Sequence, residues 1–68
     1  MIVVNGSQRD DLDGPMTVRA LLDALDMPHD GRGVAVAVES TVVPRGDWET
    51  TTIDDGGRVE VLVAVQGG

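Results

Sequence analysis

The chain has 68 residues, with five arginines, no lysine and twelve Asp or Glu, so its formal net charge is −7. A chain of this length forms one domain with a thin hydrophobic core and leaves little room for the deep pocket that most enzymes use. The negative charge repels phosphate backbones, and the single aromatic residue offers little surface for base stacking, which argues against nucleic-acid binding. The absence of cysteine excludes a disulfide framework, a thiolate zinc site and a cysteine persulfide.

The start of the chain predicts a β-hairpin. Residues 2–4 form an apolar, mostly β-branched run that ends at Asn5-Gly6, a dipeptide typical of hairpin turns. Residues 8–12 would form a weaker return strand, which Gly14-Pro15 interrupts. The same N-terminal segment lacks the charged and long apolar regions of a signal peptide, and no stretch reaches the roughly 20 apolar residues of a membrane span. We therefore expect a cytoplasmic protein without a membrane partner.

One helix follows the hairpin. Thr17 is a good N-cap, since its hydroxyl can accept a hydrogen bond from a free amide of the first turn. Apolar residues then recur at helical spacing and form one apolar face: Val18, Leu21, Leu22 and Leu25. Pro28 would end this helix.

The second half of the chain predicts three more strands. Residues 34–38 alternate valine with alanine, as in a strand buried mainly on one face, and a turn at Glu39-Ser40-Thr41 leads to a short strand over residues 42–43. Residues 46–52 would be irregular, with Trp48 covering one edge of the core. After a turn at residues 54–57, residues 58–65 form the strongest strand of the chain.

These elements predict a single α+β domain over residues 1–68, in the order β-β-α-β-β-β. Only one helix is available, so it must cover one face of a mixed sheet. The first and last strands are the most apolar, and we place them centrally and side by side. No metal site is predicted: aligning Gly14 with the calcium-loop glycine of an EF-hand puts Arg9 and Ala20 where ligands are needed.

The last strand presents two different faces. Its core face would carry four valines at alternate positions: Val59, Val61, Val63 and Val65. Leu62 and Ala64 lie on the opposite face, which the helix does not cover. That face meets either solvent or a partner, because scattered exposed apolar residues are also normal. Leu62 and Ala64 are therefore candidates for a docking surface.

The chain ends in a flexible tail, Gln66-Gly67-Gly68, which could simply be frayed. Glycines without side chains can also enter a narrow channel in another enzyme. A terminal carboxylate on Gly68 would be an anion with a pKa near 3.5, and so a poor electrophile. ATP could activate it as an acyl adenylate, and a sulfur nucleophile could then displace AMP to leave a thiocarboxylate. We expect no catalytic residue and no intrinsically bound cofactor in the chain itself.

Several short motifs occur together in a specific order. They are Val4-Asn5-Gly6, Thr17-Val18 with Leu21-Leu22, the strand of residues 34–38, residues 42–45 followed by Trp48, Asp55-Gly56, Arg58-Val59-Glu60, and Val65-Gln66-Gly67-Gly68. In this order and spacing the chain resembles, along essentially its whole length, the ThiS family of thiamine-biosynthesis sulfur carriers, which are ubiquitin-like β-grasp proteins. It departs from the family pattern at two turns, with Glu39-Ser40 where Asn-Gly is common and Gly57 where Asp is common.

The resemblance implies a mechanism and partners. An E1-like adenylyltransferase of the ThiF type would adenylate Gly68 with Mg-ATP, a sulfur donor such as a cysteine desulfurase relay would supply sulfur, and the thiocarboxylate would serve a ThiG-type thiazole synthase. Gly67 and Gln66 would form the narrow stretch of chain that leads to Gly68. Three alternatives stay open: sulfur transfer for molybdopterin or another pathway, a ubiquitin-like protein modifier, and a plain interaction module with an inert tail.

Overall fold

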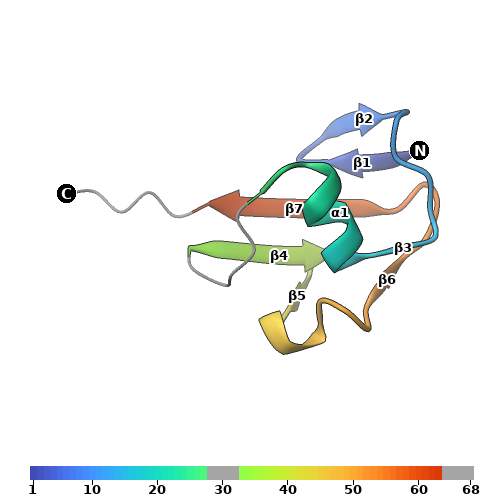
Figure 1. Ribbon diagram of the computed structural model, residues 1–68. Coiled ribbons are helices and arrows are strands. Elements are labelled where there is room, and N and C mark those ends of the chain that lie inside the picture. Colours follow the sequence, from blue (N-terminus) through green and yellow to red (C-terminus); the bar gives the residue numbers. More distant parts are fainter. Residues whose placement is uncertain (28–32, 64–68) are drawn as a thin grey trace.

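The computed structural model describes residues 1–27 and 33–63. In this part of the chain a mixed five-stranded sheet has the order β2-β1-β7-β4-β5, and helix α1 lies across one face of it (Figure 1). Strands β3 and β6 form a separate pair. The elements are β1 Ile2–Val4, β2 Ser7–Arg9, β3 Met16–Thr17, α1 Val18–Ala24, β4 Val34–Val38, β5 Thr41–Val43, a 3-10 helix Arg45–Asp47, β6 Thr52–Ile53 and β7 Arg58–Val63. The predicted α+β class, with one helix on a mixed sheet, is confirmed.

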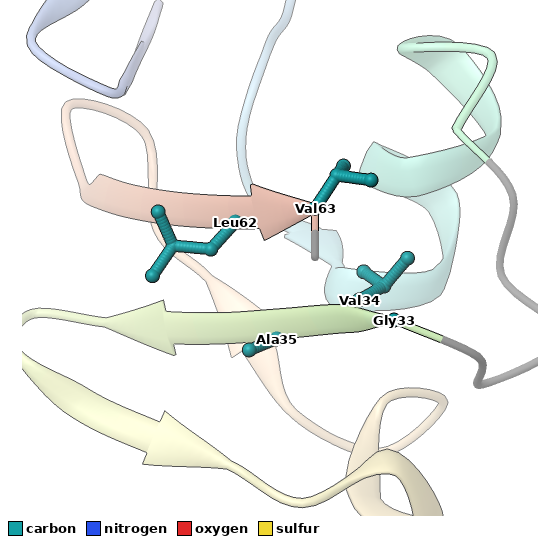
Figure 2. Close-up of a pocket in the computed structure, with 5 residues that line it drawn as sticks. All are labelled: Gly33, Val34, Ala35, Leu62 and Val63. Atoms are coloured by element: carbon teal, nitrogen blue, oxygen red, sulfur yellow. The ribbon is translucent and has the colours of Figure 1, made fainter. Parts of the chain in front are cut away.

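Strand β7 occupies the middle of the sheet. It runs parallel to β1 on one side and antiparallel to β4 on the other. The prediction that the first and last strands lie side by side is therefore confirmed. Ala35 on β4 stands opposite Leu62 on β7, and both side chains lie on the face of the sheet away from α1 (Figure 2).

The helix begins where Thr17 was predicted to cap it. The Thr17 hydroxyl accepts a hydrogen bond from the Ala20 amide at 3.1 Å. The two preceding helical amides donate to carbonyls of the segment before β6, Val18 to Thr51 and Arg19 to Trp48, at 3.0 Å each. Three of the four amides that a helix N-terminus leaves open are thus satisfied, two of them by tertiary contacts.

The helix ends earlier than Pro28, so that prediction is wrong. It stops at Ala24, and Asp26 takes a left-handed conformation with φ 56°. The Met27 amide donates to the Leu22 carbonyl at 3.0 Å and the Asp26 amide to the Asp23 carbonyl at 3.1 Å. These two bonds form a Schellman motif, which closes a helix without proline.

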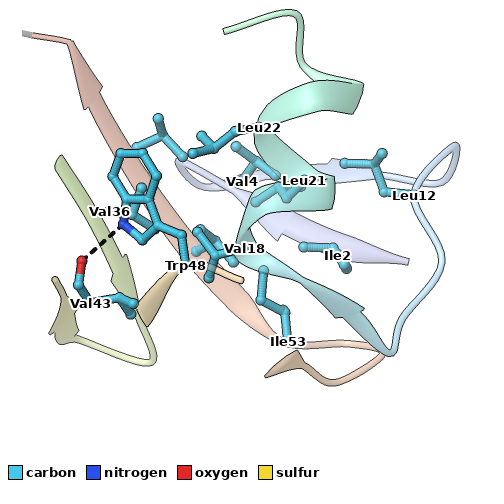
Figure 3. Close-up of a cluster of buried hydrophobic side chains, with 12 residues drawn as sticks. Ile2, Val4, Leu12, Val18, Leu21, Leu22, Val36, Val43, Trp48 and Ile53 are labelled. Carbon is cyan, nitrogen blue, oxygen red and sulfur yellow. Dashed lines mark hydrogen bonds between the residues drawn. The ribbon is translucent and has the colours of Figure 1, made fainter. Parts of the chain in front are cut away.

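The core lies between α1 and the sheet and contains the predicted apolar helix face (Figure 3). Trp48 covers one edge of it, as expected, and its buried indole N–H donates to the Val43 carbonyl at 3.0 Å. This bond satisfies the one polar atom of a large apolar side chain. The buried residues are Ile2, Val4, Leu12, Val18, Leu21, Leu22, Val36, Val43, Trp48, Ile53, Val59 and Val61.

Three further predictions need correction. The second strand ends at Arg9 rather than at residue 12, and Leu12 reaches the core from the loop that follows. Residues 46–52 are not wholly irregular, because they contain part of the 3-10 helix and the first residue of β6. Val63, at the last described position of β7, is 49% exposed rather than buried. Residues 64 and 65 of the predicted last strand lie outside the described residues.

Candidate functional site

Of the predicted site residues, Leu62 lies within the described part of the chain. It stands one residue before the end of β7, is 65% exposed, and projects from the face opposite α1. The predicted exposure of Leu62 is therefore confirmed. Ala64, Gln66, Gly67 and Gly68 lie outside the described residues.

Leu62 belongs to a small apolar surface that three strands build together. We call Leu62, Ala35, Ala37 and Val42 the outer patch. The sheet register brings them together, since Ala35 is opposite Leu62 and Ala37 is opposite Val42. Because the two alanines are small, they leave a shallow hollow of about 70 Å³ between Leu62 and Val42, with Glu60 at its rim.

Sequence reasoning missed Val42, which is 72% exposed. It was read only as part of a short strand with Val43. Neighbouring residues of a strand point to opposite faces, so only one of the two valines can reach the core, and Val43 does. That parity was the available signal, but only the pairing of β5 with β4 places Val42 beside Ala37.

A second, wider hollow lies where β7 ends and β4 begins. It has a volume of about 460 Å³ and is lined by Gly33, Val34, Ala35, Leu62 and Val63 (Figure 2). Val34 and Val63 point toward the helix side of the sheet, while Leu62 and Ala35 point away from it. The last described residues of β7 are thus surrounded by apolar side chains on both faces.

Charged contacts gather at the other end of β7. Asp55 accepts hydrogen bonds from the Met1 amino group and, at 3.0 Å, from the Gly14 amide. The Met1 amino group holds the pKa of Asp55 below its ordinary value, with help from the Gly14 amide, and Asp55 raises the pKa of that amino group. These exposed groups join the N-terminus, the loop at Gly14 and the turn before β7.

Arg9 and Asp11 form a second exposed pair, at 2.8 and 2.9 Å. The hydrogen bond from Arg9 lowers the pKa of Asp11. Within the described ranges, His, Asp and Glu side chains form no group of three that could hold a metal ion. No helix in that part of the chain is long and apolar enough to cross a membrane.

Comparison with known proteins gives the family. The model of the ThiS family matches residues 2–68. The chain belongs to the ThiS family. A crystal structure of a thiamine biosynthesis protein (ThiS) from Geobacter metallireducens is 33% identical, with 98% of this chain and 97% of that chain covered and a TM-score of 0.74. The resemblance drawn from the motifs is therefore confirmed, and with it the ubiquitin-like β-grasp fold.

Two further similarities extend this result. A solution structure of a thiamine biosynthesis protein from Geobacter metallireducens is 32% identical and has a TM-score of 0.79, with 98% of this chain and 86% of that chain covered. A thiazole synthase from Paramagnetospirillum magneticum is 34% identical over 67 residues, which are 98% of this chain. The chain spans 20% of the length of that curated relative.

Proposed function

We propose that this member of the ThiS family is a sulfur carrier in thiamine biosynthesis. It acts as a protein cosubstrate, and the catalytic groups belong to its partners. The single observation that carries the proposal is the family match over residues 2–68, joined to a fold shared with thiamine biosynthesis proteins.

The reacting group in this proposal is the carboxylate of Gly68. It attacks the α-phosphorus of ATP, the bond to the pyrophosphate group breaks, and an acyl adenylate forms with release of pyrophosphate. A persulfide sulfur on a donor such as a cysteine desulfurase relay then attacks the acyl carbon and displaces AMP, which gives an acyl disulfide. A second thiol of the partner attacks the donor's sulfur, so the S–S bond breaks, the thiocarboxylate is released and a disulfide remains on the donor. Gly67 and Gln66 carry this end into the partner's channel, where a bulky side chain at position 67 would collide with the walls. Mg-ATP is the partner's substrate and not a cofactor of this chain.

The outer patch is the proposed docking surface, together with Ala64. Its occupant is an E1-like adenylyltransferase of the ThiF type, and a ThiG-type thiazole synthase receives the sulfur. Exposed Leu62 and Val42 offer apolar area to such a partner, and Glu60 stands at the rim of the hollow. With a net charge of −7, the chain favours a partner whose apolar surface is bordered by basic residues. Similarity to a thiazole synthase also supports this pathway.

Intact-mass measurement of the protein isolated from its own host tests the proposal. We expect a fraction that ends at Gly68 and has one oxygen of the terminal carboxylate replaced by sulfur. The control is a variant without Gly67 and Gly68, which should fold but carry no sulfur and fail to restore growth without thiamine. Growth of a deletion strain that carries this truncated form would refute the proposal. A native product that extends beyond Gly68 and is never processed back would refute it as well.

A further inference from the structure

The side chain of Asn5 completes the hydrogen-bond ladder between β1 and β7. The backbone amide of Val3 donates to the Gly57 carbonyl and that of Asn5 to the Val59 carbonyl, at 2.9 Å each. In a regular parallel ladder, the next bonds would join the Val61 amide to the carbonyl of residue 5 and the amide of residue 7 to the Val61 carbonyl. Strand β1 ends at Val4, however, and the backbone turns away with φ 50° at Asn5.

The Asn5 carboxamide supplies both missing bonds. Its Oδ1 accepts from the Val61 amide at 2.8 Å, and its Nδ2 donates to the Val61 carbonyl at 3.0 Å. One side chain therefore presents the same acceptor and donor that two further residues of β1 would present. As a result, the chain can turn back into β2 while β7 stays bound on its β1 side as far as Val61.

Val61 immediately precedes Leu62, so the two hydrogen bonds from Asn5 act directly beside the proposed docking surface. On its other side β7 pairs with β4 up to Val63. Without Asn5, pairing on the β1 side would end at Val59, and the last four described residues of β7 would be held from one side alone. A strand held from one side can twist and shift more freely than a strand held from both.

We propose that Asn5 is a positioning residue of the carrier, which holds β7 at Val61 so that Leu62 meets the adenylating enzyme in one orientation. This inference rests on the proposed function. It differs from a role in the turn alone, because glycine adopts a positive φ at least as readily as asparagine. Asn5→Gly therefore keeps the turn and removes only the two side-chain hydrogen bonds to Val61.

Steady-state adenylation kinetics test this inference, with the host's adenylating enzyme, Mg-ATP and varied carrier, followed by pyrophosphate release. Because β7 would then be held less firmly at Val61, Asn5→Gly should raise the KM for the carrier roughly tenfold, which corresponds to about 1.4 kcal/mol. We expect kcat to stay within about twofold, because the reacting carboxylate is unchanged. Asn5→Asp, which places an oxygen against the Val61 carbonyl, should raise KM at least as much.

Two controls separate positioning from a loss of stability. Ile53→Val removes one methyl group from the core and should lower the urea midpoint of unfolding, yet it should leave the KM unchanged. Amide hydrogen exchange by NMR should become faster at Val61 in Asn5→Gly and stay unchanged at Val36, which lies on β4. Faster exchange at Val61 with a wild-type KM would overturn the inference, as would an equal rise in KM for Ile53→Val.

The remaining outcomes are also decisive. If both Asn5 variants lose the dispersed NMR spectrum of a folded chain, Asn5 is a residue of general stability and the inference is wrong. If the wild-type chain releases no pyrophosphate with any adenylating enzyme of its host, the proposed function fails and this inference fails with it. Adenylation of Asn5→Gly at the wild-type KM would leave the proposed function intact and overturn this inference alone.

Discussion

Truncation of Leu62 tests the docking surface most directly. Leu62→Ala removes Cγ and both Cδ atoms, which are worth about 0.8 kcal/mol each when buried. Because 65% of Leu62 is open in the free chain, covering it in a complex should contribute about 1.5 kcal/mol. We therefore expect the KM for the carrier in adenylation to rise roughly tenfold.

The same substitution should leave the free protein almost unchanged, since surface substitutions usually alter the free energy of unfolding by about 0.5 kcal/mol or less. Leu62→Met, which keeps the apolar volume, is the matched control and should retain a KM close to wild type. Val42→Ala tests whether the outer patch reaches β5. A wild-type KM for Leu62→Ala would refute the docking surface, and so would a tenfold rise that comes with an equally large loss of stability.

Three further predictions concern stability. Gly14→Ala should lower the free energy of unfolding by about 1–3 kcal/mol, because a Cβ atom would lie 2.3 Å from the backbone nitrogen of Asp55. Gly46→Ala is its control and should stay within about 0.5 kcal/mol, since nothing lies near the added atom; equal midpoints in urea would contradict this. Ser40→Gly should raise the free energy of unfolding by about 0.5 kcal/mol, seen as a higher urea midpoint at unchanged slope, because Ser40 has φ 69° and glycine carries no Cβ penalty there; a lower midpoint would refute the strain. Finally, the lowered pKa of Asp55 contributes stability that is present above the unfolded carboxyl pKa of about 3.9 and is lost as pH falls through the folded value. The raised pKa of the Met1 amino group contributes stability that is present below 8.0 and is lost as pH rises through its folded value. Asp55→Asn should reduce the dependence of the unfolding temperature on pH in both the acid and the alkaline range. An unchanged pH dependence would show that the pair of Asp55 and the Met1 amino group does not contribute to stability.

The elements that could be predicted are those that local rules specify. Alternation in residues 34–38 and 58–63 sets which side chains enter the core, and helical spacing after Thr17 sets the buried face of α1. Both patterns depend on residues close together in the chain. The exposure of Leu62 followed from the same alternation, as did the burial of Val59 and Val61.

The predictions that failed depend on distant parts of the chain. Strands β3 and β6 are two residues long and carry no periodic signal, and they form only because they meet each other. The helix ends through the left-handed conformation of Asp26, which is uncommon for any residue other than glycine and is therefore hard to anticipate from the sequence. Val63 has the alternation expected of a core position, yet about half of it is exposed in the structure.

The turn at Glu39-Ser40, which departs from the family pattern, also combines a local feature with a contact between distant residues. Glu39 and Ser40 both adopt positive φ, 49° and 69°, as the commoner Asn-Gly would. The Glu39 carboxylate also accepts a hydrogen bond from the Arg58 amide at 2.6 Å, which asparagine at this place need not do. The turn thus keeps the backbone conformation that Asn-Gly would give, and it adds a contact that the sequence did not indicate.

The class of fold, the buried faces of the helix and strands, and the motifs by which the chain resembles its family could all be read from the sequence, because each follows from neighbouring residues. Three contacts became visible only in the folded chain: Val42 joins Leu62 in one surface, Asn5 binds Val61, and Gly14 lies against Asp55. These contacts join segments up to 56 positions apart in the chain. Which segments meet is fixed by packing of the whole domain and not by the pattern within either segment.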